Sequence, residues 1–133
     1  MLFRSKDTND FGYMLTGRTY GDSEIYKLER KEGVRWEYTV IAEFDGTAGC
    51  YYYLKDANVL YVSSDESLLK VDLSNGAVTT LCGEDYWKYM PASSVVELNG
   101  CLYWGTSCGI YELSIETGKV TWFPVYYEKY VKP

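Results

Sequence analysis

An internal repeat of about 42 residues constrains the fold of this chain more than any other feature of its sequence. Residues 59–81 align on residues 101–123 without a gap, so that Gly76 falls on Gly118. A less similar copy runs through residues 25–36, where Gly33 lies 43 positions before Gly76. We therefore expect three copies of one structural unit. The positions that are identical in the two later copies are Leu60 and Leu102, Tyr61 and Tyr103, Val78 and Val120, and Thr79 and Thr121.

Apolar and polar residues alternate within each copy, which is the pattern of a β-strand with one drier face. In the third copy Tyr111, Leu113 and Ile115 share one face, and Glu112 and Ser114 share the other. A period of two predicts strands, and we expect almost no helix. The equivalent apolar positions of the earlier copies are Tyr26, Leu28, Leu69, Val71 and Leu73.

Turn residues divide each copy into four strands. Asn58 and the Asn99-Gly100 pair join the first strand to the second, while Gly76 and Gly118 join the third to the fourth. We expect a left-handed backbone at both of these last glycines. The predicted strands are 11–16, 24–29 and 35–42, then 51–54, 59–63, 67–73 and 77–81, then 94–97, 101–105, 109–115 and 119–125. The innermost strand of the first copy is either missing or supplied by residues 2–4.

Four antiparallel strands at this period are typical of a β-propeller blade. The stretch 109–122, in which a Thr-Gly-Lys turn precedes a strand that carries Trp122, resembles the repeat of the PQQ-like and related β-propellers. The first copy departs from this pattern because Trp36 comes one place early, and the second because Thr80 replaces the tryptophan. The resemblance implies architecture alone, since nothing here matches the quinone site of the quinoprotein enzymes.

We therefore predict an all-β protein of about three four-stranded antiparallel propeller-type blades. It forms a single domain over residues 1–133, with repeats at about 2–42, 50–82 and 93–125 and an aromatic tail at 126–133. Propellers close with four or more blades, so three would form a partial propeller that oligomerisation or a partner completes. Because apolar flanks are rarely left in water, we expect a homodimer that closes a ring of six blades. The predicted flank residues are Tyr26, Leu28, Tyr111, Leu113 and Ile115.

The chain contains no histidine, which excludes Ser-His-Asp and Cys-His catalysis and the usual transition-metal ligands. It also lacks the GxGxxG and GxxxxGK[ST] motifs that cradle phosphates. We predict that the protein is not an enzyme and has no metal site and no cofactor. The weakest alternative is a glycosidase that works through the carboxylates of Asp65, Glu66, Glu84 and Asp85.

The net charge of −6 disfavours nucleic acid as a ligand and favours a basic protein surface as a partner. No apolar run approaches the roughly 18 residues that cross a bilayer, so we expect no membrane contact and a cytoplasmic location. The cysteines form no CxxC pair, and we interpret them as buried free thiols, with disulfides as the alternative. They are Cys50, Cys82, Cys101 and Cys108.

The loops that join the second strand to the third, and each blade to the next, differ in every copy. A rigid scaffold often carries its binding residues on loops of this kind. The aromatic and acidic segment around Trp87 is the most site-like of them, although Trp87 could instead fill the gap between two blades. The predicted binding residues are Tyr20, Asp22, Asp65, Glu66, Glu84, Asp85, Tyr86, Trp87 and Tyr89.

These observations favour a non-enzymatic protein-interaction module. An inhibitor or an immunity-type protein that covers a basic surface is one form that such a module takes. A lectin-like protein, which would stack sugar rings on exposed aromatic side chains, is the alternative, with a carbohydrate as its ligand. The tyrosines of the 51–53 run are expected to pack against a neighbouring blade or to line a central opening.

Overall fold

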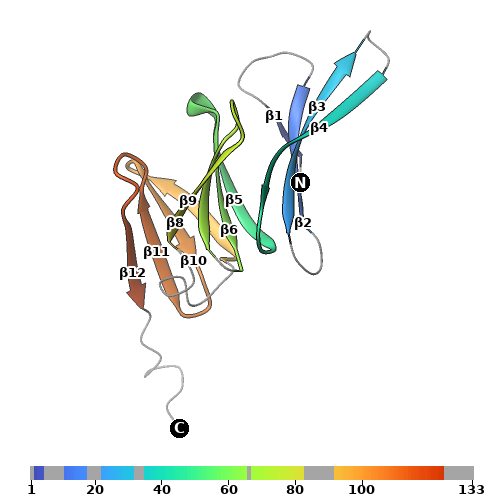
Figure 1. Cartoon of the computed structure of the whole chain (residues 1–133). Coiled ribbons are helices and arrows are strands. Elements are labelled where there is room, and N and C mark those ends of the chain that lie inside the picture. The colour runs from blue at the N-terminus through green and yellow to red at the C-terminus, as the bar shows by residue number, and fades with distance from the viewer. Residues whose placement is uncertain are drawn as a thin grey trace.

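The computed structural model describes residues 2–4, 11–17, 22–31, 35–65, 67–82 and 92–124. These residues form twelve β-strands and one 3-10 turn, Lys55–Ala57. The strands make three four-stranded antiparallel sheets in which neighbours in sequence are neighbours in space (Figure 1). The first sheet holds β1 (Leu2–Arg4), β2 (Phe11–Gly17), β3 (Ser23–Lys31) and β4 (Arg35–Phe44). The second holds β5 (Ala48–Leu54), β6 (Val59–Ser64), β7 (Leu68–Asp72) and β8 (Ala77–Cys82), and the third holds β9 (Ser94–Leu98), β10 (Cys101–Gly105), β11 (Gly109–Ser114) and β12 (Val120–Pro124).

The all-β fold and the division of each copy into a four-stranded antiparallel unit are confirmed. Leu2–Arg4 does supply the first strand of the first sheet, since Leu2 pairs with Met14 across β1 and β2. The three sheets do not close into a barrel or a ring, so the propeller classification stays a prediction. Within the ranges that the structure describes, no helix is long and apolar enough to span a membrane.

The hairpin turns follow the predicted chemistry. Gly76 and Gly118 have φ values of 76° and 75°, which confirms the left-handed conformation expected at both. Asn99 and Gly100 also have positive φ, at 52° and 80°. Positive φ at both central residues defines the type I′ hairpin, whose twist matches that of the strands it joins. The repeat therefore specifies the hairpins locally.

The second sheet lies between the other two and separates two hydrophobic clusters (Figure 1). All six residues of β6 are buried, because side chains on alternate sides of the strand enter different clusters. Leu60 and Val62 enter the cluster between the first and second sheets. Val59 and Tyr61 enter the cluster between the second and third sheets. A strand buried on both faces has no solvent-facing side, which explains the apolar run of residues 59–62, and the buried Ser63 and Ser64 that follow are both hydrogen-bonded.

Tyrosines of β5 connect the second sheet to both neighbours. The Tyr53 hydroxyl donates to Asn58 Oδ1 (3.0 Å), and Asn58 Nδ2 is 3.5 Å from the Tyr13 hydroxyl of the first sheet. On the other side, the Tyr52 hydroxyl donates to a carboxylate oxygen of Glu97 in the third sheet. This hydrogen bond raises the pKa of Tyr52. The interpretation that these tyrosines pack against neighbouring sheets is confirmed.

The prediction that Tyr111, Leu113 and Ile115 lie on an open flank is wrong. Tyr111 and Leu113 are fully buried against the second sheet, and Ile115 packs on the same cluster. The reason is that equivalent positions of the repeat point the same way in every sheet. In the second and third sheets, the side chains at these positions point toward the preceding sheet. The first sheet has no preceding sheet, so its residues at these positions, Tyr26 and Leu28, lie on an uncovered face.

The four cysteines are all described, and all four are free thiols. Cys82 is buried, while Cys50, Cys101 and Cys108 are half-buried, so the prediction of buried free thiols holds fully for one of the four. Burial raises the pKa of Cys82 to about 11. The structure thus rests on packing between sheets, without covalent cross-links.

Candidate functional site

Only two of the predicted binding residues, Asp22 and Asp65, lie among the residues that the structure describes. Both are exposed, at the end of the molecule where the connections between sheets lie. No hydrogen bond or ion pair in the described part of the chain joins these two side chains, and the cluster predicted around Trp87 lies outside the described residues. The predicted residues outside the described ranges are Tyr20, Glu66, Glu84, Asp85, Tyr86, Trp87 and Tyr89.

Asp65 holds two loops together. The backbone N–H of Thr47 donates to Asp65 Oδ1 (2.8 Å), and the backbone N–H of Asp65 donates to the carbonyl of Thr47 (3.1 Å). Beside this pair, the Ser23 hydroxyl donates to the carbonyl of Gly46 (2.8 Å) and accepts from the N–H of Ala48 (3.1 Å). These contacts give Asp65 a role in fixing the connection between β4 and β5. No group of three or more His, Cys, Asp or Glu side chains in the described ranges could hold a metal ion.

A hollow of about 390 Å³ lies between the first and second sheets at the same end of the molecule. Its walls combine apolar side chains with hydroxyls and two carboxylates. The hollow is open to solvent and no buried polar group points into it in the described set, so its chemistry does not select a ligand. It is lined by Glu43, Phe44, Asp45, Ser67, Leu69, Val78 and Thr80.

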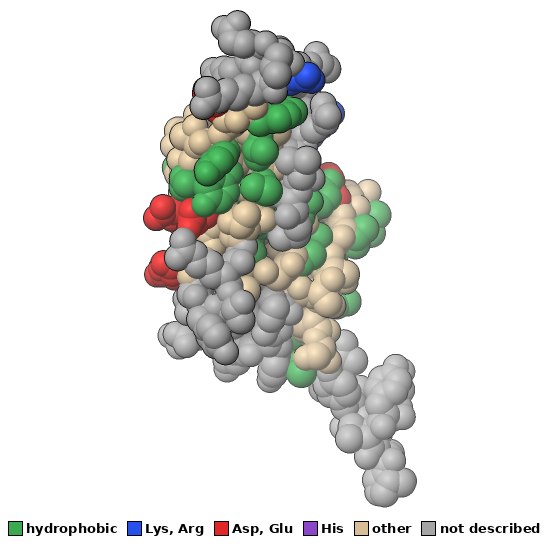
Figure 2. Space-filling view, turned by 90° about the vertical axis from the view of Figure 1, so that its right-hand side faces the viewer, with side chains coloured by type: hydrophobic (Ala, Val, Ile, Leu, Met, Phe, Trp, Pro, Cys, Tyr) green, Lys and Arg blue, Asp and Glu red, His purple; other side chains and the backbone are tan. Residues whose placement is uncertain are grey.

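The first sheet presents a large apolar surface to solvent on the side away from the second sheet. Trp36, Tyr38 and Val40 alternate along β4 and are 54%, 72% and 40% exposed. Register places Val40 opposite Tyr26 and Tyr38 opposite Leu28, and both of these β3 side chains are half-buried. We call this surface, which also includes Met14, the first-sheet outer face. Figure 2 looks onto it and shows hydrophobic side chains gathered beside acidic ones.

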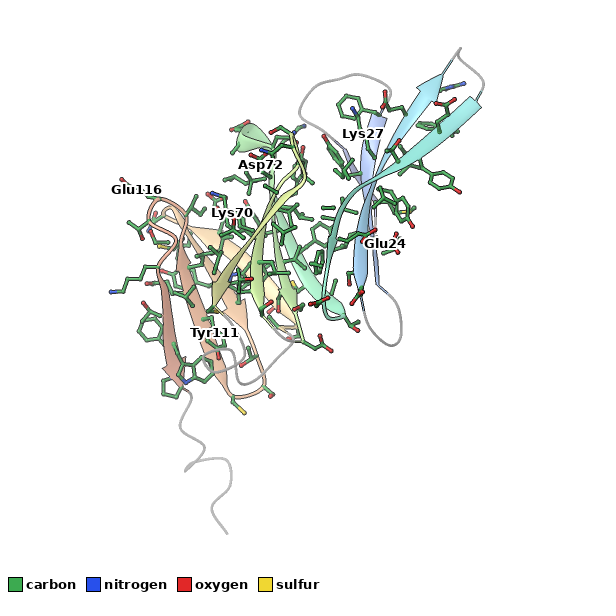
Figure 3. The ribbon with its side chains drawn as sticks, viewed as in Figure 1. Glu24, Lys27, Lys70, Asp72, Tyr111 and Glu116 are labelled. Carbon is green, nitrogen blue, oxygen red and sulfur yellow. The ribbon has the colours of Figure 1, made fainter. Side chains whose placement is uncertain are left out.

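Two aromatic side chains of the first-sheet outer face, Tyr26 and Tyr38, contact each other. The rings of Tyr26 and Tyr38 meet edge to face, with centroids 5.6 Å apart. The Tyr26 hydroxyl donates to Glu24 Oε2 (2.6 Å), which anchors the outer end of the ring. Figure 3 shows Glu24 on this side of the sheet and Lys27 on the opposite side, toward the second sheet. The face is therefore an ordered apolar surface with an acidic border.

The repeat shows what this face corresponds to elsewhere. Tyr26 and Leu28 align with Leu69 and Val71 of the second sheet, which are at most 4% exposed, and with Tyr111 and Leu113 of the third, which are at most 1% exposed. The ring of Tyr111 stacks on Trp122 at 4.4 Å, as Tyr26 contacts Tyr38. The same positions are thus buried in two sheets and open in one.

The third sheet has an apolar surface of its own, on the side away from the second sheet. Within it, the Tyr103 hydroxyl bonds to the carboxylate of Glu112, which raises the pKa of Tyr103. Register along β9, β10, β11 and β12 places Tyr103 and Glu112 on the same side of the sheet as the apolar residues named below. We call this surface the third-sheet outer face. Its exposed apolar residues are Val96, Leu98, Ile110 and Phe123, and its half-buried ones include Cys101 and Tyr103.

The exposed surface formed by Trp36, Tyr38 and Val40 was not among the features predicted from the sequence. These residues alternate along β4, and register pairs Tyr38 with Leu28 and Val40 with Tyr26, but strands that pack within the chain show the same alternation. A comparison of this chain with protein-family models and with curated proteins finds no match in either set.

Proposed function

We propose that this protein is a non-enzymatic protein-interaction module that binds its partner through the first-sheet outer face. The observation that carries the proposal is the contrast between equivalent positions, which are fully buried against another sheet in two copies, whereas in the first copy they are half-buried beside the exposed Trp36, Tyr38 and Val40. A face of this composition, left in water, marks a site that another molecule covers.

The shape and chemistry of the first-sheet outer face suit a protein surface. Tyr and Trp side chains are the residues that interfaces favour, because they bury a large area and lose little side-chain entropy. Trp36 and Tyr38 stand on the part of β4 that pairs with β3 without a register shift, so their backbone positions are fixed before a partner binds. The face is a sheet surface, and an apolar sheet face of the partner would pack on it at the usual separation of about 10 Å.

The inhibitor and immunity hypotheses, and the basic partner that they imply, stay predictions, because the acidic loop residues behind them lie mostly outside the described ranges. The lectin-like alternative stays a prediction for the same reason, since it rests on Trp87. The proposal made here depends only on the sheet face.

The test is a capture experiment with matched variants. The chain, immobilised at low density, is exposed to extract from its source cells and to untagged copies of itself, alongside the variants Tyr38→Asp and Thr79→Asp. Thr79 is exposed on β8 of the second sheet and lies on neither outer face, so it is the control. We expect a protein that the parent and Thr79→Asp retain and that Tyr38→Asp loses. Equal capture by all three chains would refute a role for the face.

A further inference from the structure

Two contacts between sheets occur within the chain, and each joins a pair of sheet faces. The two outer faces of the chain are one further pair of the same kind. We propose that the first-sheet outer face of one copy packs on the third-sheet outer face of a second copy, head to tail. Two such contacts, related by a two-fold axis, close two copies into one ring of six sheets. This inference rests on the proposed function, because it names the partner of the same face.

The two outer faces are of complementary kinds. In the first contact within the chain, a face of the first sheet that carries Leu15 meets the face of the second sheet that carries Val62. In the second contact, the face with Tyr61 meets the face of the third sheet with Trp104. We call the face that a sheet turns toward the following sheet its forward face, and the face that it turns toward the preceding sheet its backward face. Each contact therefore joins the forward face of one sheet to the backward face of the next.

The third-sheet outer face is the forward face that lacks a following sheet. Tyr103 aligns with Tyr61, and Ile110 aligns with Leu68. Tyr61 and Leu68 are 3% and 0% exposed because the third sheet covers them, whereas Ile110 is exposed and Tyr103 half-buried. In the same sense, the first-sheet outer face is the backward face that lacks a preceding sheet. Joining the two continues the series of contacts already present.

The charges on the two faces are compatible with this pairing. Arg30 lies on the first-sheet outer face, at the position that Leu73 takes in the second sheet. Glu112 lies on the third-sheet outer face, where the first two sheets carry Lys27 and Lys70 on their forward faces. The first-sheet outer face thus offers a positive charge, and the third-sheet outer face a negative one, beside their apolar side chains. Glu24 stands at the other end of β3 from Arg30.

The size of the faces favours closure over a single contact. Four strands of about five residues cover roughly 300 Å² in projection at the standard spacings of a sheet. One such contact is small beside the ~800 Å² per partner that stable interfaces bury, and using both flanks of each copy doubles the area. A ring of six sheets also lies within the range of about four to eight in which propellers close.

The main experiment measures mass against concentration by sedimentation or light scattering. We expect the parent chain and Thr79→Asp to pass from one copy of 15.3 kDa to two copies and no further. Tyr38→Asp on the first-sheet outer face and Val96→Asp on the third-sheet outer face should each remain single at concentrations where the parent is paired. Both residues are exposed, and circular dichroism with thermal melting shows whether each variant keeps the parent's fold.

Mixing the two variants tests the head-to-tail arrangement directly. Tyr38→Asp keeps an intact third-sheet outer face and Val96→Asp keeps an intact first-sheet outer face, so the mixture can form one of the two contacts. We expect a two-copy species in the mixture, at higher concentration than the parent needs. If Val96→Asp pairs by itself while Tyr38→Asp does not, like faces meet and the head-to-tail arrangement is wrong.

The remaining outcomes separate this inference from the proposed function. A parent that stays single at every concentration overturns the second copy as partner, and capture of another protein that Tyr38→Asp alone loses would leave the proposed function standing. Growth beyond two copies overturns the closed ring. Pairing that survives in Tyr38→Asp, together with unchanged capture, overturns both.

Discussion

Gly76 and Gly118 occupy the same turn of successive repeats, yet their replacement should have different costs. Both have left-handed backbone angles, which cost a residue with a Cβ about 1–2 kcal/mol. At Gly118, a Cβ atom would have only Leu81 Cδ2 within reach, at 3.9 Å. At Gly76, it would lie well inside van der Waals contact with the carbonyl oxygen of Ile41. The oxygen belongs to the backbone of β4, beside the irregularity in its pairing with β3, so relief requires the first sheet to move.

The expected magnitudes follow from these contacts. Gly118→Ala should lower the free energy of unfolding by about 1 kcal/mol, because less backbone entropy is lost on folding and this offsets part of the strain. Gly76→Ala should lower it by about 3 kcal/mol, since an overpacked contact adds roughly 1–3 kcal/mol. For a chain of this length, the gap corresponds to about 6–10 °C in melting temperature. Replacement of both by valine, which resists positive φ more strongly, should preserve the order.

Asparagine separates the two causes. It tolerates the left-handed region but carries a Cβ atom, so Gly118→Asn should melt close to the parent while Gly76→Asn remains strongly destabilised. Urea unfolding followed by tryptophan fluorescence and by circular dichroism provides the free energies, and agreement of the two probes checks two-state behaviour. Equal destabilisation of the alanine variants at the two positions would show that the contact between Gly76 and Ile41 does not carry the difference.

Three further predictions concern individual side chains. Burial raises the pKa of Cys82 to about 11 from 9.0, so the thiol of the unfolded chain loses its proton at lower pH than that of the folded chain, and the free energy of unfolding should fall between pH 9 and about 11. In Cys82→Ala the contribution of this thiol to the fall should disappear, as measured by urea unfolding at each pH. The Ser74 hydroxyl and N–H both donate to Asp72 Oδ1 (2.5 and 2.9 Å) and hold the pKa of that carboxyl below its usual value, so Ser74→Ala should raise it in an NMR titration, and an unchanged pKa would assign the shift elsewhere. Asn99→Val should cost about 1–2 kcal/mol in a chemical melt, because β-branched residues resist the positive φ of the type I′ turn, whereas Asn99→Gly should cost little.

Much of the fold could be predicted because its information is local and repeated. Alternation along residues 109–115 and the glycine after each third strand define strands and turns without reference to the rest of the chain. Whether a given face of a strand is buried cannot be predicted in this way, since it depends on whether another sheet lies on that side. Tyr26 and Tyr111 have the same place in the repeat, and only the order of stacking leaves Tyr26 half-buried on an outer face and buries Tyr111 fully.

The candidate site was harder to predict for a related reason. Trp36, Tyr38 and Val40 have the sequence pattern of any half-buried strand, so nothing local distinguishes a face that packs within the chain from one that is left exposed. Asp65 shows the opposite difficulty. Its acidic side chain in a variable loop predicted a binding residue, which stays a prediction, and its carboxylate also accepts a backbone hydrogen bond from Thr47. Loop carboxylates often have this structural use, which sequence alone does not separate from binding.

The second sheet contributes to both hydrophobic clusters, and this position affects the order in which parts of the chain unfold. Each outer sheet is held by one cluster, whereas β6 contributes to both and is buried along its whole length. In stacked arrays of this kind, nearest-neighbour contacts set the order of local unfolding. Amide hydrogens of β6 and β7 should therefore exchange with solvent last, and protection should decrease outward through β2 and β11 to the edge strands. If protection were uniform across the three sheets, the array would open in a single concerted step.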